Sequence, residues 1–152
     1  MVLYLVRHGQ TEKNKFGIVQ GRTECNLSKK GIAGAKELIP IVSKLKIDVV
    51  ISSPLKRAYD TAKIITEGRY PINIDDRLIE RDWGLCEGVS IDEVDTVKCW
   101  NFYENTADNK IERVQDLMAR LSEFLESIKQ IPEDGDMSKI EIPNLRIIEY
   151  EI

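Results

Sequence analysis

The sequence predicts an α/β domain built around a mostly parallel sheet. Short apolar runs rich in strand-forming residues alternate with segments whose apolar positions follow the helical period, and turn residues separate them. With 42% hydrophobic and 32% charged residues, the 152-residue chain has the composition of a globular protein. At this length a compact fold buries roughly 70% of the unfolded surface, so a single domain needs neither disulfides nor a structural metal. We therefore expect one domain over residues 1–152.

The first predicted elements are a strand and an interrupted helix. The continuous apolar run from Val2 to Val6 predicts a strand that is buried on both faces and central in the sheet. After a polar loop, Ser28 is placed to cap a helix. The apolar positions of this helix are Ile32, Ala35, Leu38, Ile39, Val42 and Leu45. Pro40 lies inside the pattern and predicts a kink or an early end.

Two further strands follow, with a helix between them. Asp48 to Ile51 predicts a second buried strand, which the Ser52-Ser53-Pro54 turn ends. The helix that begins there carries its inward face on Leu55, Ala58, Ala62 and Ile65. Pro71 to Asp75 predicts a short third strand, and Leu78 to Gly88 predicts a loop.

Two more helices are predicted before residue 130. Ser90 with Glu93 three residues later has the capping-box signature, which predicts a helix running toward Trp100. An amphipathic pattern predicts a long helix from about Ile111 to Lys129.

The alternation then breaks. A strand should follow the long helix, but Gln130 leads directly into Ile131 and the turn-forming residues 132–136. The last strand is predicted from Arg146 to Ile152, where alternating apolar residues suit a half-exposed edge.

Charge and cysteine content exclude several classes of protein. The net charge of −4 and the pI of about 5.2 argue against a nucleic-acid binder, which normally has a basic face. The cysteines Cys25, Cys86 and Cys99 are odd in number and lack metal-like spacing, so a reducing compartment fits best. The opening apolar run is too short for a membrane span or a secretory signal. We therefore expect a cytoplasmic protein with no nucleic-acid or membrane partner.

His8 is the first candidate for chemistry. It is the single histidine of the chain and follows the first predicted strand, between Arg7 and Gly9, with Thr11 and Asn14 in the loop beyond. Ligands of open α/β sheets bind at the carboxyl ends of the strands. The alternative is an arginine and a histidine that merely end a strand, and this short motif alone does not decide between the two.

Arg57 is the second candidate. The helix after the second strand places Arg57 in its first turn, where free N–H groups and the helix dipole attract anions. A guanidinium there is a forked, permanently charged clamp for phosphate oxygens, although a solvated surface arginine is the commoner case. If the two strands are parallel neighbours, His8 would lie between the guanidinium groups of Arg7 and Arg57.

Glu80, in the loop after the third strand, is the third candidate. A carboxyl group near a phosphate ester can protonate the leaving alcohol if burial or nearby anions raise its pKa. A carboxylate in a loop has no specificity as a motif, and taken alone it is more simply an ordinary charged loop residue.

Four segments together resemble the histidine phosphatase superfamily, also called phosphoglycerate mutase-like. They are RHGQT at 7–11, GRTECNLSKKG at 21–31, SSPLKRAYDTA at 52–62 and LIERDWGLCEG at 78–88. The similarity is strongest over residues 1–130. It implies a three-layer α/β/α sandwich and a phosphohistidine mechanism that needs no metal and no cofactor.

The resemblance also implies roles for particular residues. His8 would be the nucleophile and Glu80 the general acid. Arg7, Arg57 and Asn14 would bind the substrate phosphate. The remaining expected pocket-lining residues are Gly9, Thr11, Thr23 and Glu24.

One part of the family pattern is missing. The family carries a second histidine after a later central strand, whereas this chain contains one histidine. The expected position coincides with the break between Gln130 and Ile131, so we expect the domain to lack one central strand-helix unit. A missing central strand would expose a flank of the first strand, which favours rearranged pairing by the tail strand or a homodimer.

The sequence therefore leaves three functions open. The leading expectation is a metal-independent phosphomonoester phosphatase that acts through a phosphohistidine on a small phosphorylated metabolite, with impaired activity. The first alternative is an inactive phosphate-binding or regulatory module, and the missing histidine favours it. The second is a phosphoglycerate mutase, for which the segment from Val89 to Lys110 offers only a short lid.

Overall fold

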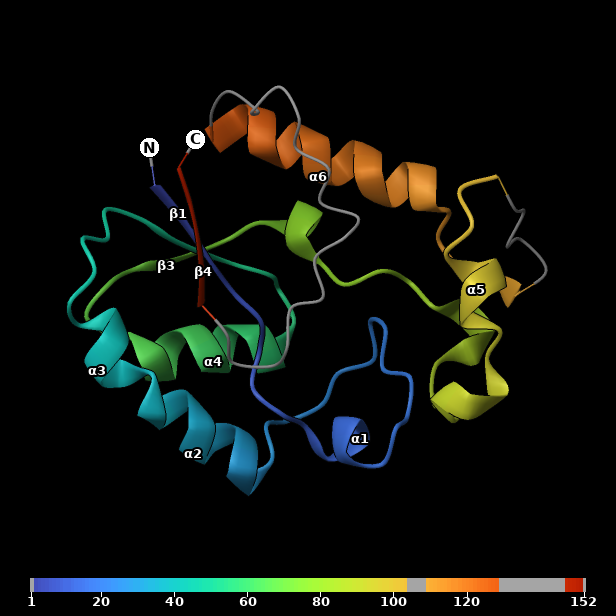
Figure 1. The fold of residues 1–152 in the computed structure, drawn as a ribbon, viewed down its shortest axis with the longest axis horizontal. Coiled ribbons are helices and arrows are strands. Elements are labelled where there is room, and N and C mark those ends of the chain that lie inside the picture. Colours follow the sequence, from blue (N-terminus) through green and yellow to red (C-terminus); the bar gives the residue numbers. More distant parts are fainter. Residues whose placement is uncertain (1, 104–108, 129–146, 152) are drawn as a thin grey trace.

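The computed structural model describes residues 2–103, 109–128 and 147–151. Helices and strands alternate along most of the chain (Figure 1). The strands are β1 (Val2–Val6), β2 (Val50–Ser52), β3 (Ile72–Ile74) and β4 (Ile147–Glu151). The helices are α1 (Glu12–Lys15), α2 (Lys29–Glu37), α3 (Ile39–Val42), α4 (Lys56–Ile65), α5 (Thr96–Cys99) and α6 (Val114–Ile128). Short 3₁₀ turns cover Asp76–Leu78, Gly84–Cys86 and Ile91–Glu93.

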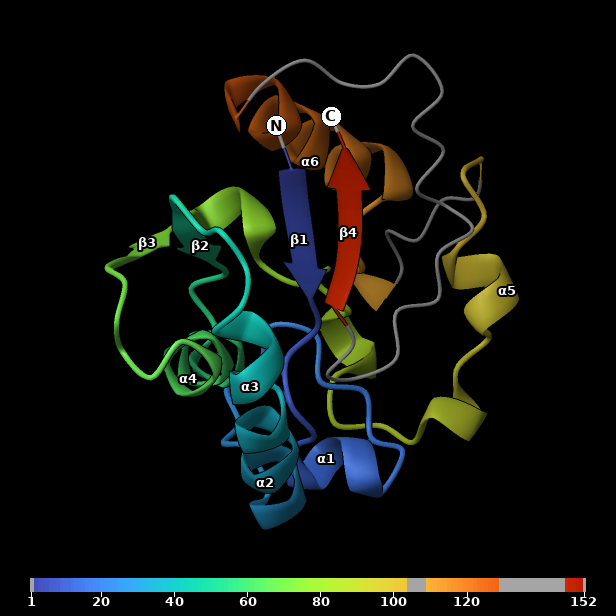
Figure 2. The same cartoon turned by 60° about the vertical axis from the view of Figure 1, so that its left-hand side comes forward.

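The strands form two hydrogen-bonded pairs. β2 and β3 are parallel, with Val50 opposite Ile72. β1 and β4 are antiparallel, with Val2 opposite Glu151, and Figure 2 shows them side by side. The expected mostly parallel sheet is thus found only in part. The tail strand pairs with β1 and supplies backbone partners to one of its edges, as an otherwise open edge requires.

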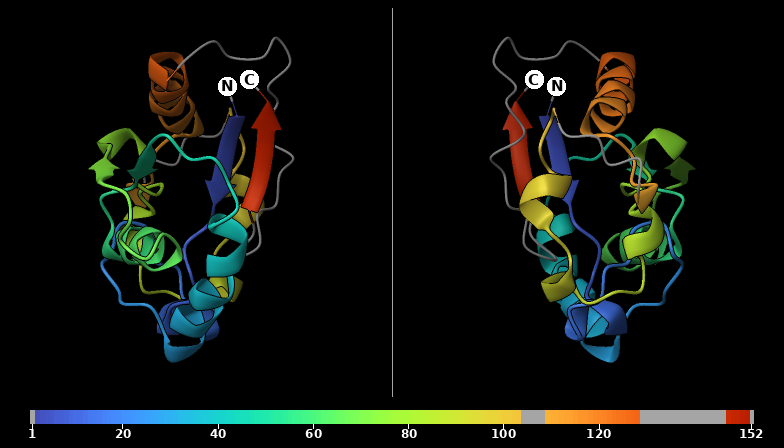
Figure 3. Two further views of the ribbon diagram at one scale, coloured as in Figure 1. Left: turned by 90° about the vertical axis from the view of Figure 1, so that its left-hand side faces the viewer. Right: turned by 90° about the vertical axis from the view of Figure 1, so that its right-hand side faces the viewer.

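Helices lie on opposite sides of these strands. In Figures 1 and 3, α6 lies on one side and α2, α3 and α4 lie on the other. The α2–α4 group packs on β1 through buried Ala35, Val42 and Ile65, with Val6 against them. This apolar cluster fixes the carboxyl end of β1 next to α4, and these are the two elements that carry His8 and Arg57.

A second apolar cluster supports the loops. Val19, Trp83, Cys99 and Ile111 are buried together, so residues from four separate segments share one small core. This cluster joins the loop after α1 to the loop after β3.

Several sequence-based expectations are confirmed by the structure. α2 begins after Ser28, whose hydroxyl accepts a hydrogen bond from the Gly31 amide at 3.0 Å. α2 ends at Glu37, and α3 begins with Pro40 in its first turn, so the proline does interrupt the pattern. The first and third strands and the helix of Arg57 also lie where they were predicted.

Other expectations are wrong or shifted. β1 is only half-buried along Leu3–Val6, because the described helices pack mainly at its carboxyl end, and it is not enclosed on both faces. β2 starts at Val50, and Val49 before it is 61% exposed. α6 starts at Val114, three residues later than expected. The break at Gln130–Ile131 lies outside the described residues.

The helix expected from Ser90 to Trp100 is absent as a continuous element. Ser90 makes no side-chain cap; instead it forms an isolated bridge with Ile18, and the next amide, of Ile91, donates to the Gly17 carbonyl at 2.8 Å. The backbone of residues 90–91 thus hydrogen-bonds to the loop of residues 17–18 and joins the two loops. α5 begins later, and the Asp95 carboxylate caps it by accepting from the Lys98 amide at 3.0 Å.

Gly31 permits the close approach of α2 to the loop after β1. A Cβ on Gly31 would lie 2.1 Å from the carbonyl oxygen of Gln10, a backbone atom that cannot move aside without shifting the loop. We expect Gly31→Ala to destabilise the protein by about 1–3 kcal/mol, because overpacking outweighs the better helix propensity of alanine. Urea unfolding measures the change. Lys36→Ala on the exposed side of α2 is the control, and equal unfolding midpoints for the two variants would contradict the prediction.

Candidate active site

His8 follows β1 and presents one ring nitrogen to the site. Its Nδ1 lies 2.8 Å from the carbonyl oxygen of Gly9, an acceptor, so Nδ1 carries the proton and donates it. Nε2 is therefore unprotonated and carries a lone pair. A neutral imidazole held in this tautomer is a competent nucleophile.

Arg57 points directly at that nitrogen. Its Nε lies 3.2 Å from Nε2 of His8 and donates to it. The guanidinium is 1% exposed, and its other nitrogens donate to two backbone carbonyls, Nη2 to Gly21 at 2.7 Å and Nη1 to Thr23 at 3.1 Å. These bonds compensate the burial of the charge and hold the guanidinium in one orientation.

The burial of His8 and the nearby cations act together on its basicity. Desolvation, followed by the positive charges of Arg57 and Arg7, lowers the pKa of His8 from 6.5 to about 4, against the opposing effect of the Gly9 hydrogen bond. The imidazole of His8 is thus neutral, with Nε2 unprotonated, over the whole neutral range.

Thr61 joins the two halves of this pair through the backbone. Its buried hydroxyl accepts from the Gly9 amide at 2.9 Å and donates to the Arg57 carbonyl at 2.7 Å. The residue after the histidine is therefore tied to the helix of the arginine. Thr61 lies in the SSPLKRAYDTA segment at 52–62. Within that segment, only its position one helical turn after Arg57 indicates that it could join the two residues.

Thr23 and Glu24 lie in the loop that holds Arg57. Thr23 supplies a carbonyl to the guanidinium, as described above. The carboxylate of Glu24 is exposed and accepts from the Lys56 amide at 3.1 Å, so it caps α4, whose own preceding residue provides no side-chain cap.

Glu87 is a residue that the sequence did not single out. Its carboxylate accepts from the amides of Arg22 at 2.7 Å, Thr23 at 2.9 Å and Trp83 at 3.3 Å, and from the Thr23 hydroxyl. Partial burial alone would raise the pKa of Glu87, but these hydrogen bonds outweigh it and hold that pKa below its usual value.

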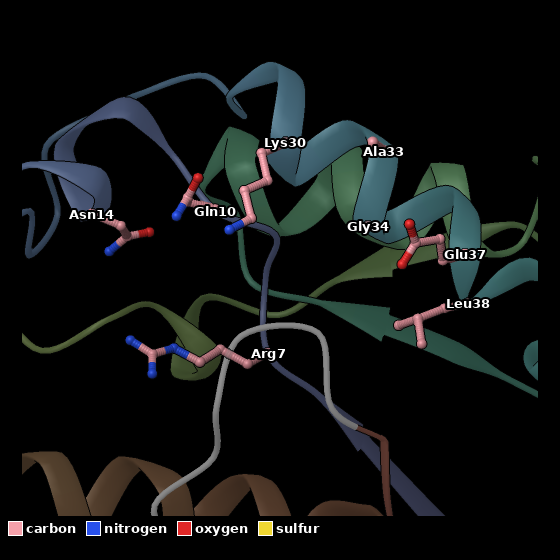
Figure 4. Close-up of a pocket in the computed structure, with 8 residues that line it drawn as sticks. All are labelled: Arg7, Gln10, Asn14, Lys30, Ala33, Gly34, Glu37 and Leu38. Atoms are coloured by element: carbon pink, nitrogen blue, oxygen red, sulfur yellow. The ribbon is translucent and has the colours of Figure 1, made fainter.

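Arg7 and Asn14 line a pocket beside α2. The pocket has a volume of about 690 Å³. It is lined by Arg7, Gln10, Asn14, Lys30, Ala33, Gly34, Glu37 and Leu38 (Figure 4). In Figure 4 the guanidinium of Arg7 extends toward the side of the pocket formed by Asn14. Two of the predicted phosphate-binding residues therefore share one half-open pocket, whose lining is both polar and apolar.

Thr11 lies inside the protein and does not line the pocket surface. It is 0% exposed, caps α1, and donates its hydroxyl to Oε1 of Gln20 at 2.7 Å. Asn14 completes the capping box of this short helix, which fixes its side chain at the edge of the pocket.

Glu80 lies in the loop after β3 and is exposed. Its Oε1 accepts from the Arg81 amide at 2.8 Å, and its carbonyl accepts from Nε of Arg22 at 3.1 Å. Glu80 is thus tied to the loop that holds Arg57.

Among the described residues there is no group of three or more His, Cys, Asp and Glu side chains arranged to hold a metal ion. Within the same residues, no helix is long and apolar enough to cross a membrane.

The fold and this site define a class of protein. A family model described as histidine phosphatase superfamily (branch 1) matches residues 3–139. The chain therefore belongs to the histidine phosphatase superfamily, a phosphoglycerate mutase-like family.

Particular relatives agree with this class. Phosphoserine phosphatase 1 of Hydrogenobacter thermophilus is 42% identical over 93 residues, which cover 60% of this chain and 44% of that protein. The uncharacterized phosphatase PhoE of Bacillus subtilis is 36% identical over 127 residues, covering 83% and 63%. The solved structure of YhfR from Bacillus stearothermophilus has a TM-score of 0.74 at 31% identity, covering 84% of this chain and 66% of that one.

The chain is shorter than these relatives. It spans between 44% and 66% of the length of the first four curated relatives that it matches.

The geometry around His8 predicts its titration. Because His8 is the single histidine of the chain, its imidazole resonances can be assigned without ambiguity. We expect an NMR titration midpoint near pH 4 in the wild type, so the neutral imidazole is lost only as the pH falls through that value. Arg57→Gln removes one of the lowering charges, and we expect its midpoint to move part of the way back toward 6.5.

Arg113→Gln is the control, because Arg113 is an exposed residue that pairs with Asp116. A wild-type midpoint near 6.5, or no difference between Arg57→Gln and the control, would contradict this description of the site.

Proposed function

We propose that this protein is a phosphomonoester phosphatase in which His8 is the phosphate acceptor. The observation that carries the proposal is the contact between Nε of Arg57 and the unprotonated Nε2 of His8. A nucleophilic nitrogen beside a fixed guanidinium suits the attack on a phosphate ester, where positioning and electrostatic stabilisation supply most of the catalysis.

The reaction has two steps. Nε2 of His8 attacks phosphorus, the bond to the ester oxygen breaks, and Glu80 gives a proton to the departing alcohol. When Nε2 bonds to phosphorus it no longer accepts from Arg57, whose Nε–H then donates to a phosphoryl oxygen. Water next attacks the phosphohistidine, with Glu80 taking its proton, and releases inorganic phosphate and free His8.

Arg7 and Asn14 complete the proposed phosphate site. Arg7 brings a second guanidinium close enough to lower the pKa of His8, and Asn14 presents an amide at the same pocket. Of the remaining candidates, Gly9 and Thr23 act through their backbones, while Thr11 and Glu24 cap the helices α1 and α4.

The substrate class that we propose is a small phosphorylated metabolite. The relatives named phosphoserine phosphatase act, by their names, on a phosphate monoester of this size. The half-open pocket beside α2, which is lined in part by Arg7 and Asn14, would receive the leaving group.

A specific observation favours a second function. The chain has one histidine, whereas the family to which it is similar uses two. By analogy with removing one oxyanion donor, the loss would lower the rate by about 10²–10³. A protein that binds phosphate esters without turning them over is therefore the competing proposal.

A mutase is the third candidate. GpmB of Escherichia coli, named a probable phosphoglycerate mutase, is 33% identical over 138 residues and supports it.

Turnover of p-nitrophenyl phosphate tests the proposal. We expect slow, chelator-insensitive hydrolysis that His8→Ala abolishes and Arg57→Ala lowers by about 10²–10³, the cost of losing one charge-stabilising donor. Arg113→Gln is the matched control and should hydrolyse the substrate at the wild-type rate, since Arg113 is exposed and pairs with Asp116. An acid-labile phosphate on His8 in a rapidly quenched reaction identifies the intermediate.

The outcomes separate the three functions. Binding of vanadate without hydrolysis of any ester supports the binding module. Transfer of phosphate to an added phosphoglycerate in preference to water supports the mutase. Inhibition by a chelator would overturn the metal-free mechanism.

A further inference from the structure

We propose that Glu87 is a positioning residue for the reaction: it sets the guanidinium of Arg57 against His8 by holding the loop of residues 21–23. The inference goes beyond the proposed function by adding a residue that the reacting groups do not touch, and it rests on that function for its effect on turnover.

Glu87 binds the loop of residues 21–23 through several hydrogen bonds. Oε1 accepts from the Arg22 amide at 2.7 Å, and Oε2 accepts from the Thr23 amide at 2.9 Å and from the Thr23 hydroxyl. Two consecutive backbone amides and a side chain are thus bound by one carboxylate. Charge-assisted bonds of this kind are roughly twice as strong as neutral ones.

The loop of residues 21–23 in turn binds the guanidinium of Arg57. The carbonyls of Gly21 and Thr23 accept from Nη2 and Nη1 at 2.7 and 3.1 Å. The Gly21 carbonyl belongs to the same planar peptide group as the Arg22 amide that Glu87 binds, and the Thr23 carbonyl belongs to the residue whose amide and hydroxyl Glu87 binds. A shift of the loop therefore moves the acceptors that orient the guanidinium.

The guanidinium of Arg57 then contacts the imidazole of His8. Nε donates to Nε2 over 3.2 Å, so a rotation of the guanidinium changes this contact directly. A misplacement of about 1 Å at a reacting group costs about 10²-fold in rate. Glu87 therefore acts on His8 indirectly, through the loop of residues 21–23 and through Arg57.

Gly21 shows how closely the two loops fit. It has a φ of +50°, and a Cβ placed on it would lie 2.0 Å from Oε1 of Glu87. Only a residue without a side chain fits the left-handed backbone and leaves the carboxylate in place. The neighbouring backbone bonds between Val19 and the 88–89 segment, both 2.9 Å, hold the loops in the same register.

Glu112 provides a matched control. Its side chain is largely buried, with 11% exposed, and it also binds Arg22, but it contacts the side chain of Arg22, with Oε2 lying 3.3 Å from Nη2. It further pairs with Arg120 and accepts from the Asp82 amide at 3.2 Å. Glu112 thus stabilises the same region without contacting the 21–23 backbone.

The experiment compares Glu87→Gln with Glu112→Gln by two measurements. The glutamine amide places a donor where Glu87 has an acceptor, so it faces the loop amides and cannot bind all of them. We expect the His8 titration midpoint to rise from about 4 in Glu87→Gln and to stay there in Glu112→Gln. We also expect kcat for p-nitrophenyl phosphate to fall by about 10²-fold in Glu87→Gln alone.

The two measurements distinguish the inference from the proposed function. A raised His8 midpoint in Glu87→Gln supports the positioning role even if the wild type hydrolyses nothing, a result that would reject the phosphatase alone. An unchanged midpoint overturns the positioning role, whatever the activity. An equal rise in Glu112→Gln also overturns it, because a general loss of stability would then explain the shift.

A second variant keeps the test decisive if Glu87→Gln fails to fold. Thr23→Val removes only the hydroxyl donor to Glu87 and leaves the amide bond at 2.9 Å. We expect a smaller rise of the His8 midpoint in the same direction, and Thr23→Ser should restore the wild-type value. No rise in Thr23→Val contradicts the positioning role.

Discussion

The hydrogen bond from Arg57 to His8 is the interaction on which the rest of the site depends. It requires a guanidinium with almost no exposed surface, and burying such a charge is unfavourable unless its donors are satisfied. The backbone supplies what is needed: two carbonyls from the 21–23 loop accept from the terminal nitrogens. The charge that prepares the imidazole is therefore stabilised mainly by main-chain groups, whose geometry the fold itself determines.

This arrangement explains why residues far from the reacting atoms matter. Thr61 ties the backbone after His8 to α4, Glu24 caps that helix, and Glu87 holds the loop. Each of these side chains hydrogen-bonds to backbone and none hydrogen-bonds to the imidazole. Beyond them, Arg22 joins the carbonyl of Glu80 to the carboxylate of Glu112, so the loop that carries the proposed acid belongs to the same network.

The elements around the site were predictable because their signals are local. The cap at Ser28, the interruption at Pro40 and the first turn of α4 each follow from one or a few adjacent residues. The helix predicted from Ser90 was wrong, because a capping-box pattern does not reveal that the Ser90 backbone pairs with the distant loop at Ile18. The pairing of the tail strand with β1 was only one of the alternatives that the sequence left open, because pairing depends on which edges remain open in three dimensions.

The site was predictable only in its principal residues. His8 and Arg57 stand at strand and helix ends, positions that attract ligands in any α/β protein. Glu87 lies in the LIERDWGLCEG segment at 78–88. Nothing in the neighbouring sequence distinguishes a carboxylate that binds a second loop from one that is solvated. Its role comes from contacts with residues more than sixty positions away, and such contacts leave no pattern in a single sequence.

The pairing of β1 with β4 has a consequence for how the chain folds. The strand that leads to His8 finds its ladder partner far along the chain, with Val2 opposite Glu151. Closing so large a loop costs entropy before any stabilising contact forms, and topologies dominated by such distant pairings fold slowly. During synthesis the ladder between β1 and β4 can form only after β4 has left the ribosome, so the backbone that leads to His8 gains this support late in folding.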